Sequence, residues 1–209
     1  MKKCTYIMLM AALMALLFAT AALADEPRFS DLEEGAWYVP YVNRLVDQGI
    51  INGFADGTVR PEAYMSFGEA LKLVMQQAGY GAIEATGEHW ASGYMAQAVE
   101  DGLLDGMFDC WQKEYNLDRP FDRLSMAQLL LNTLEFPSVT TYGLYIDCEE
   151  PAAGAMYAFG IMEGSFTKNG HRVFEPYNSL TRAEGCTVLC RVQDFMAAEA
   201  AKAEDVPAK

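Results

Sequence analysis

The stretch Gly-Ile-Ile-Asn-Gly at residues 49–53 returns twice further along the chain with small changes. It appears as Gly-Leu-Leu-Asp-Gly at residues 102–106 and as Gly-Ile-Met-Glu-Gly at residues 160–164, at steps of 53 and 58 residues. Similarity at such a period is typical of proteins built from packed repeats. We therefore expect one unit written three times, with function in the surfaces that the units build together.

A second pattern follows each copy: a proline, a hydroxyl residue five positions later, and Glu or Gln three positions after that. A hydroxyl followed three residues later by Glu or Gln predicts a capping box, and hence the first turn of a helix. The prolines are Pro61, Pro120 and Pro176, the hydroxyl residues are Ser66, Ser125 and Thr181, and the last residues are Glu69, Gln128 and Glu184.

Each unit also has a helical apolar pattern before its glycine-bounded stretch. In the first unit Trp37, Tyr41 and Leu45 recur at a spacing of four residues, and Gly49 is placed to end the helix. The sequence thus predicts a mainly α fold of helix, turn-rich loop and helix, with short extended pieces in the loops. We expect units at residues 25–80, 88–135 and 144–196, and an acidic, alanine-rich tail at residues 197–209 that frays.

The first 24 residues have the pattern of a secretory signal peptide. Lys2 and Lys3 precede an apolar run, and Ala22-Leu23-Ala24 is typical of a cleavage site. A retained membrane anchor is the alternative, because the run approaches spanning length. The sequence has no second apolar run of that length, so we expect a secreted product that does not cross the membrane after cleavage.

Charge narrows the possible partners. All 29 acidic residues follow the leader, against 13 basic ones (15 less Lys2 and Lys3), which gives a formal net charge of 13 − 29 = −16. Such a chain repels nucleic acid and anionic lipid. An anionic ligand therefore has to be held by a local basic group, and nucleic acid is not expected as a partner.

Four cysteines follow the leader: Cys110, Cys148, Cys186 and Cys190. Export permits disulfides, and four cysteines allow three pairings. Buried free thiols and a bridge between Cys110 and Cys148 both remain open, whereas a bridge between neighbours on one helix would be strained. Neither His89 nor His171 stands at ligand spacing from a cysteine, so no metal site and no cofactor is expected.

The repeats resemble the S-layer homology (SLH) family. The first unit reads Phe29, Asp31, Trp37, Gly-Ile-Ile-Asn-Gly-Phe at residues 49–54, Asp-Gly-Thr at residues 56–58 and Arg-Pro at residues 60–61. The third unit ends in Leu-Thr-Arg-Ala-Glu at residues 180–184. The middle unit resembles the family chiefly by its register. The resemblance covers nearly all of the chain after the leader.

This resemblance implies a pseudo-threefold helical bundle that anchors an exported protein to the bacterial cell surface through grooves between its units. It implies an anionic secondary cell-wall polysaccharide, often carrying ketal pyruvate, or modified peptidoglycan as the partner. The arginine of Thr-Arg-Ala-Glu is the family's anion-holding residue. The candidate ligand-binding residues are Arg182, Thr181, Glu184, Trp37 and Asp56.

The chain departs from the family's pattern where a ligand would bind. With the helix starts placed at Ser66 and Ser125, the arginine position holds Phe67 and Met126. Four other basic residues could substitute at these grooves, although their spacing does not match the motif: Arg60, Lys72, Arg119 and Arg123. Glycan binding is then either reduced to one groove or lost, in which case the scaffold is structural or binds an envelope protein partner. Trp37 and Trp90 fit core anchors, with sugar stacking as the alternative. No paired carboxylates or activated nucleophile stand out, so we expect no enzyme.

Overall fold

The computed structural model describes residues 28–204, so the predicted signal peptide lies outside the described residues. Helices dominate this part of the chain, as predicted, and the only sheet within it is one short antiparallel hairpin. The elements are α2 (Val39–Asp47), α3 (Phe67–Gln77), α4 (Ser92–Glu100), the 3-10 turns η1 (Asp109–Gln112) and η2 (Glu114–Asn116), α5 (Arg123–Thr133), α6 (Pro151–Ala158), β1 (Ser165–Phe166), β2 (Arg172–Val173) and α7 (Arg182–Glu204).

The repeated glycine ends the first helix of each unit, as the sequence predicts. Gly49, Gly102 and Gly160 have φ values of +69°, +70° and +69°. That left-handed conformation is accessible to glycine at little cost. It turns the next residue back so that its amide bonds a helix carbonyl, for example the Ile50 amide to the Leu45 carbonyl at 2.9 Å.

The outer two helix caps form as predicted. At the start of α3 the Ser66 amide donates to the Glu69 carboxylate at 2.9 Å, and the Glu69 amide donates to the Ser66 hydroxyl at 3.3 Å. At the start of α7 the Thr181 amide donates to the Glu184 carboxylate at 2.8 Å, and the reciprocal bond is 3.2 Å long. Each box satisfies two amides that have no partner inside the helix.

The predicted cap of the middle unit is wrong by three residues. The residue that caps α5 is Asp122, whose carboxylate accepts from the Ser125 amide and from the Ser125 hydroxyl, both at 2.8 Å. Ser125 is therefore fully buried inside the first turn and does not precede it. Gln128 makes no capping bond, and its side-chain oxygen has no hydrogen-bond partner.

A closed ring of backbone hydrogen bonds joins the three units and fixes their correspondence. The residues just before the three caps are Met65, Phe121 and Leu180, all buried. The Met65 amide donates to Leu180, the Leu180 amide to Phe121 and the Phe121 amide to Met65, each at 2.9 Å. This cyclic arrangement confirms the expected pseudo-threefold bundle, with Ser66, Asp122 and Thr181 as equivalent positions.

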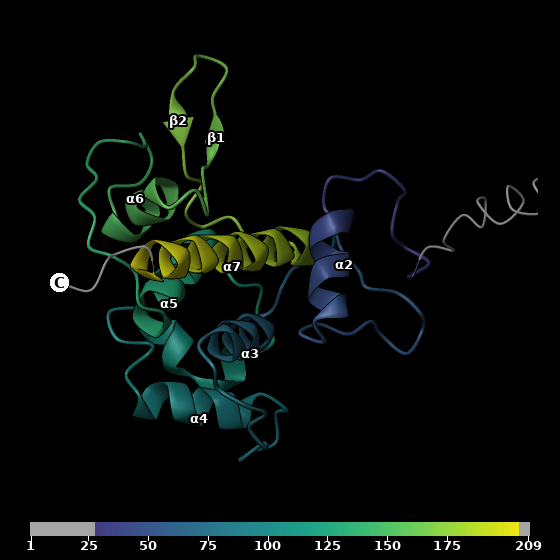
Figure 1. Ribbon diagram of the computed structural model, residues 1–209. Helices are drawn as coiled ribbons and strands as arrows, with labels where there is room; N and C mark the ends of the chain where they lie inside the picture. Colours follow the sequence, from purple (N-terminus) through teal and green to yellow (C-terminus); the bar gives the residue numbers. More distant parts are fainter. Residues whose placement is uncertain (1–27, 205–209) are drawn as a thin grey trace, which may run out of the picture.

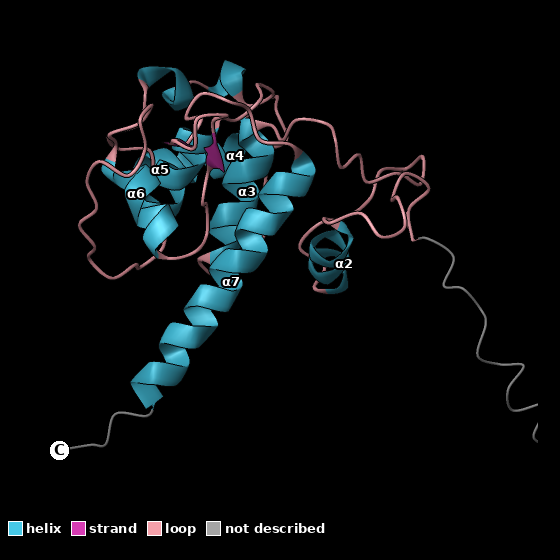
Figure 2. Cartoon of the chain, turned by 90° about the horizontal axis from the view of Figure 1, so that it is seen from above, coloured by secondary structure: helices cyan, strands magenta, loops and turns pink. Residues whose placement is uncertain are grey.

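The helices pack between units. The second helix of each unit contacts the first helix of the next, in the pairs α3 with α4, α5 with α6, and α7 with α2. Figure 1 shows α7 running across the molecule, and Figure 2 shows its C-terminal half extending beyond the other helices. Because each pair joins two units, a unit buries its apolar faces only when its neighbours are present.

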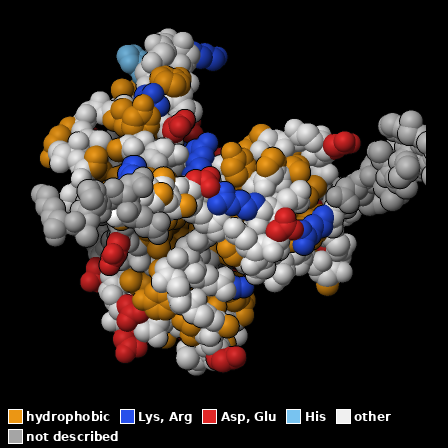
Figure 3. Space-filling view, viewed as in Figure 1, with side chains coloured by type: hydrophobic (Ala, Val, Ile, Leu, Met, Phe, Trp, Pro, Cys, Tyr) orange, Lys and Arg blue, Asp and Glu red, His pale blue; other side chains and the backbone are white. Residues whose placement is uncertain are grey.

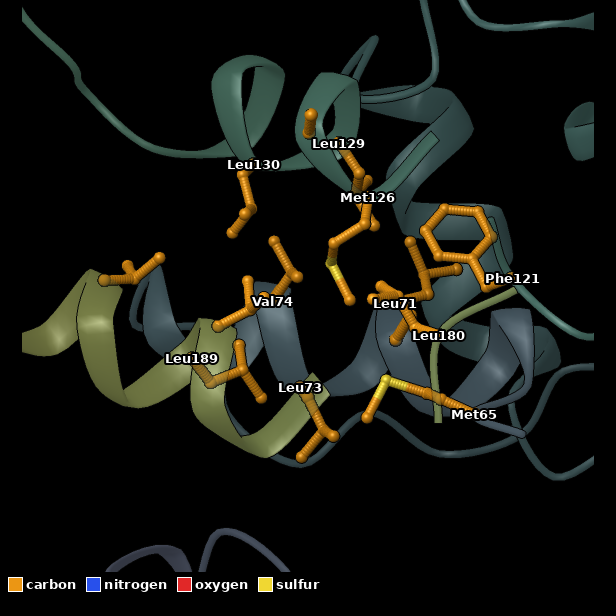
Figure 4. Packing of buried hydrophobic residues seen from close by; sticks show 14 of the residues in the cluster. Met65, Leu71, Leu73, Val74, Phe121, Met126, Leu129, Leu130, Leu180 and Leu189 are labelled. Carbon is orange, nitrogen blue, oxygen red and sulfur yellow. The ribbon is translucent and has the colours of Figure 1, made fainter. Parts of the chain in front are cut away.

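The shared core lies where the three second helices meet. Four side chains converge there beside Phe121, which belongs to the ring of backbone hydrogen bonds: Leu71 and Val74 of α3, Leu130 of α5 and Leu189 of α7 (Figure 4). All five side chains are buried. The three units therefore share one hydrophobic core, although their individual boundaries stay a prediction.

An aspartate near the start of two units holds the chain that leads into the second helix. The two Asp31 carboxylate oxygens accept from the Val59 and Arg60 amides, at 2.8 and 2.6 Å. Asp147 accepts from the Phe174 and Glu175 amides in the third unit, both at 2.8 Å. These bonds give a structural reason for the aspartate of the repeat.

The four described cysteines are free thiols, so the structure does not form the bridge considered between Cys110 and Cys148. Cys186 and Cys190 are buried on α7. Burial raises the pKa of the Cys186 thiol to about 12 and that of Cys190 to about 11. Among the described residues no helix has both the length and the apolar character needed to span a membrane.

Candidate functional site

Two grooves lie at equivalent junctions between units. The first, called the Arg182 groove, is bounded by the loop that follows α2, one face of α3, Arg182 of α7 and a tryptophan that precedes α4. Its lining comprises Ile50, Ile51, Asn52, Phe54, Glu69, Lys72, Leu73, Trp90 and Arg182. Four segments distant in sequence thus meet at this site.

The second groove repeats this construction with the next pair of units, and is called the Arg123 groove. It is bounded by Arg123 of α5, the loop that follows α6, one face of α7 and the tryptophan that precedes α2. Its lining comprises Trp37, Arg123, Ile161, Met162, Glu163, Gly164, Leu180, Glu184, Thr187, Val188 and Arg191.

The two arginines make the same structural contacts. Each directly follows a helix cap, and its backbone amide bonds the preceding segment of another unit: Arg182 to Ala63 at 2.8 Å, and Arg123 to Asn178 at 3.0 Å. The Arg182 Nε donates to the Val59 carbonyl at 3.0 Å, and the guanidinium lies 5.0 Å from the centre of the Phe54 ring.

For Arg123, Nε donates to the Phe174 carbonyl at 2.8 Å, with the guanidinium 5.1 Å from the Phe174 ring. The carbonyl acceptors Val59 and Phe174 each stand seven residues before their own unit's cap. The sequence-based register placed Met126 at the arginine position of the middle unit, and this is wrong. Arg123 occupies it, so two of the three units keep an arginine there.

The two guanidinium groups differ in their acidic partners. Arg182 forms an ion pair with Glu69, and its side chain is only 11% exposed. Arg123 forms no ion pair with any residue in the described part of the chain, although Glu184 lines the same groove. The Arg182 charge is therefore neutralised within the protein, whereas the Arg123 charge has no such partner.

The third junction is filled with aromatic side chains. Phe67 stands at the arginine position and stacks on Phe121, with ring centres 5.1 Å apart. Trp111, from the longer loop of the middle unit, lies 5.1 Å from Phe67 and 4.9 Å from Phe121. All three side chains are buried. Ser125 replaces the capping carboxylate here, so this junction lacks both charged groups of the other two.

The tryptophans expected as core anchors lie on the surface instead. Trp37 is 57% exposed and Trp90 is 48% exposed, and each lines one groove. Trp111, in the closed junction, is buried. An exposed indole at a groove edge presents a flat apolar face with a polar edge, which suits partly wetted ligands such as sugars.

The structure does not bring the five predicted site residues together. Arg182 lines one groove, while Glu184 and Trp37 line the other. Thr181 lines neither and caps α7. Asp56 belongs to a turn outside both linings, where its carboxylate accepts from Thr58 and Arg60. These hydrogen bonds lower the pKa of Asp56 to about 2.

Of the four basic residues considered as substitutes for the missing arginines, Arg123 and Lys72 line a groove, whereas Arg60 and Arg119 line neither. Sequence reasoning missed Asn52 as a groove residue. The repeated Gly-Ile-Ile-Asn-Gly stretch was a signal for Asn52, because the three residues that follow its first glycine line a groove in two units. In the described part of the chain, no group of three or more His, Cys, Asp and Glu side chains is arranged to hold a metal ion. Over the face in Figure 3, acidic side chains are dispersed and do not form one patch.

Comparison with known proteins gives a family match at the first unit. Residues 28–71 match the model of the S-layer homology domain. The chain is 27% identical to S-layer protein EA1 of Bacillus anthracis over 193 residues, 86% of this chain and 21% of that protein. It is 23% identical to S-layer protein sap of Bacillus anthracis over 208 residues, 95% of this chain and 25% of that protein.

A cell surface protein of Thermoanaerobacter kivui is 26% identical over 132 residues, 63% of this chain and 15% of that protein. The chain thus spans at most about a quarter of the length of these curated relatives. The matched residues 28–71 include Phe29, the Asp31 carboxylate that holds the chain before α3, the glycine turn after α2 and the capping box of α3. The first unit, at residues 28–71, is therefore an S-layer homology domain, and the chain is similar over most of its length to S-layer proteins.

Proposed function

We propose that this protein is a non-catalytic module that attaches to the bacterial cell wall from outside the cell. Its ligand is an anionic secondary cell-wall polysaccharide carrying a carboxylate such as ketal pyruvate, bound in the grooves between units. The observation that carries the proposal is the recurrence of one constellation at two junctions: an arginine, a capping glutamate, the glycine-bounded loop and an exposed tryptophan.

The chemistry of this constellation suits an acidic sugar polymer. An indole offers a face for the apolar side of a sugar ring, and the cations of the groove linings offer charge-assisted hydrogen bonds to a carboxylate. Two equivalent grooves allow one polymer, or two neighbouring ones, to be engaged at two points, which raises the effective affinity. The names of the relatives, which are S-layer and cell surface proteins, agree with a location at the envelope.

A second function is favoured by one observation. Arg182 already has an acidic partner in Glu69, and the third junction is closed by Phe67 and Trp111. A scaffold whose anion sites are neutralised or filled would instead support a structural role or bind an envelope protein. This alternative predicts no retention on purified cell-wall sacculi, whether or not they carry the polymer.

The test is retention on purified cell-wall sacculi, native and stripped of the secondary polymer, using the chain from Asp25 onward. We expect retention on native sacculi alone. The double variant Trp37→Ala with Trp90→Ala should lose it, because both side chains are exposed groove residues. Tyr115→Ala, which truncates an 81% exposed aromatic outside both linings, is the matched control and should bind normally.

Three results of this experiment would contradict the proposal in different ways. Equal retention on stripped sacculi would point to modified peptidoglycan as the ligand. No retention on native sacculi would favour the protein-partner alternative. Full retention by the double tryptophan variant would move the binding site away from the grooves.

A further inference from the structure

We propose that Lys72, and not the motif arginine Arg182, supplies the positive charge that an anionic sugar meets in the Arg182 groove. This inference rests on the function proposed above and names the residue that selects the ligand's charge. It follows from how each charged group in the groove is already engaged within the protein.

The Arg182 guanidinium is largely committed to the fold. Its Nε donates to the Val59 carbonyl, one terminal nitrogen pairs with Glu69, and its plane lies beside the Phe54 ring. These contacts join α7 of the third unit to the first unit. A ligand carboxylate would have to compete with a partly buried carboxylate that is already in place, so Arg182 acts mainly as a positioning residue.

Lys72 has no such partner. It stands one helical turn after Glu69 on α3 and lines the same groove, and it forms no ion pair with the described residues. Both Glu69 carboxylate oxygens already accept a hydrogen bond, one from Arg182 and the other from the Ser66 amide, so the Glu69 charge is engaged elsewhere. An unpaired ammonium at a groove wall keeps its three donors available to a ligand.

The charge balance of the lining gives the same answer. Arg182 and Lys72 contribute +2 and Glu69 contributes −1, so the Arg182 groove carries +1. Without Lys72 the sum is zero. In the field of a strongly acidic protein, that single charge decides whether an anion is attracted to the groove.

The Arg123 groove lacks this charge. The position that corresponds to Lys72 is Thr187, six residues after the cap, and the position of Asn52 is Glu163. Its lining has two arginines and two glutamates, Arg123 and Arg191 against Glu163 and Glu184, which sum to zero. The Arg182 groove therefore carries the net positive charge that favours a carboxylate, whereas the unpaired Arg123 charge is offset by the two glutamates that line its groove.

The experiment measures binding of a methyl glycoside bearing ketal pyruvate to the chain from Asp25 onward, by calorimetry and by the shift of the Trp90 indole signal. The methyl ester of the same glycoside is the uncharged probe. We expect Lys72→Met to weaken binding of the acid about tenfold or more and to abolish the preference for acid over ester. Lys72→Arg should keep that preference.

Lys168→Met is the matched control, since it removes the same charge from an exposed position outside both linings. Acid binding by Lys72→Met equal to that of Lys168→Met would overturn the inference while leaving the glycan function in place. Failure of the unaltered protein to bind both the acid and native sacculi would instead overturn the proposed function, and this inference with it.

Discussion

The correspondence of the three units rests on Asp122 as the cap of α5, and replacing this residue tests it. In Asp122→Ala the Ser125 amide loses its acceptor, which costs about 1 kcal/mol for a typical cap. The Ser125 hydroxyl is fully buried and also loses its partner, which adds about 1–2 kcal/mol. The total expected loss in the free energy of unfolding is about 2–3 kcal/mol.

For a chain of this length a loss of that size lowers the melting temperature by roughly 5–10 °C. The assay is thermal and urea unfolding followed by circular dichroism. Asp122→Asn should retain most of the stability, since asparagine caps helices about as well as aspartate. Gln128→Ala is the contrasting variant, because Gln128 is the capping partner only in the sequence-based register. A large loss for Gln128→Ala together with a change under about 0.5 kcal/mol for Asp122→Ala would refute the reasoning.

Three further predictions concern the third junction, the buried thiols and Asp31. Phe67→Arg should restore the arginine of the motif yet lower the free energy of unfolding by about 3 kcal/mol or more, because Ser125 replaces the carboxylate that could pair with the buried charge. Urea unfolding measures this loss, and an unchanged midpoint would contradict the view that the third junction is closed. Burial raises the pKa of the Cys186 thiol to about 12 in the folded protein, so on raising the pH this thiol ionises in the unfolded chain before it does in the folded one. The free energy of unfolding should therefore fall as the pH rises from about 9 to 12, and urea unfolding of Cys186→Ala should show a smaller fall. Asp31→Ala should lower the free energy of unfolding by about 1–3 kcal/mol, because the Val59 and Arg60 amides lose their acceptors. A loss no larger than that of Asp56→Ala would argue against this role of Asp31.

The sequence was sufficient for the elements whose signal is local. The glycine that ends each first helix needs a left-handed backbone, and the capping boxes at Ser66 and Thr181 are complete within four residues. The same local logic was wrong at α5. Asp122-x-x-Ser125 and Ser125-x-x-Gln128 are both acceptable cap patterns, and only the hydrogen-bond ring between units decides between them.

The groove residues were less predictable because they come from different units. Glu69 appears in the sequence only as a cap, yet its second oxygen pairs with Arg182, which lies 113 residues further along the chain. Trp37 and Trp90 follow the apolar pattern of a helix, so periodicity placed them in the core. They lie at groove edges because the first helix of each unit packs on the second helix of the preceding one.

The three tryptophans allow the most direct test of the central claim, that the Arg182 and Arg123 grooves bind glycan and the third junction does not. One tryptophan lies at each junction: Trp37, Trp90 and the buried Trp111. The measurement is a titration of nitrogen-15-labelled protein with solubilised cell-wall polysaccharide, following the three indole N–H signals by NMR. The account predicts that the Trp37 and Trp90 signals shift in a saturable way while the Trp111 signal stays in place. A shift confined to Trp111, or no shift of any of the three, would contradict it.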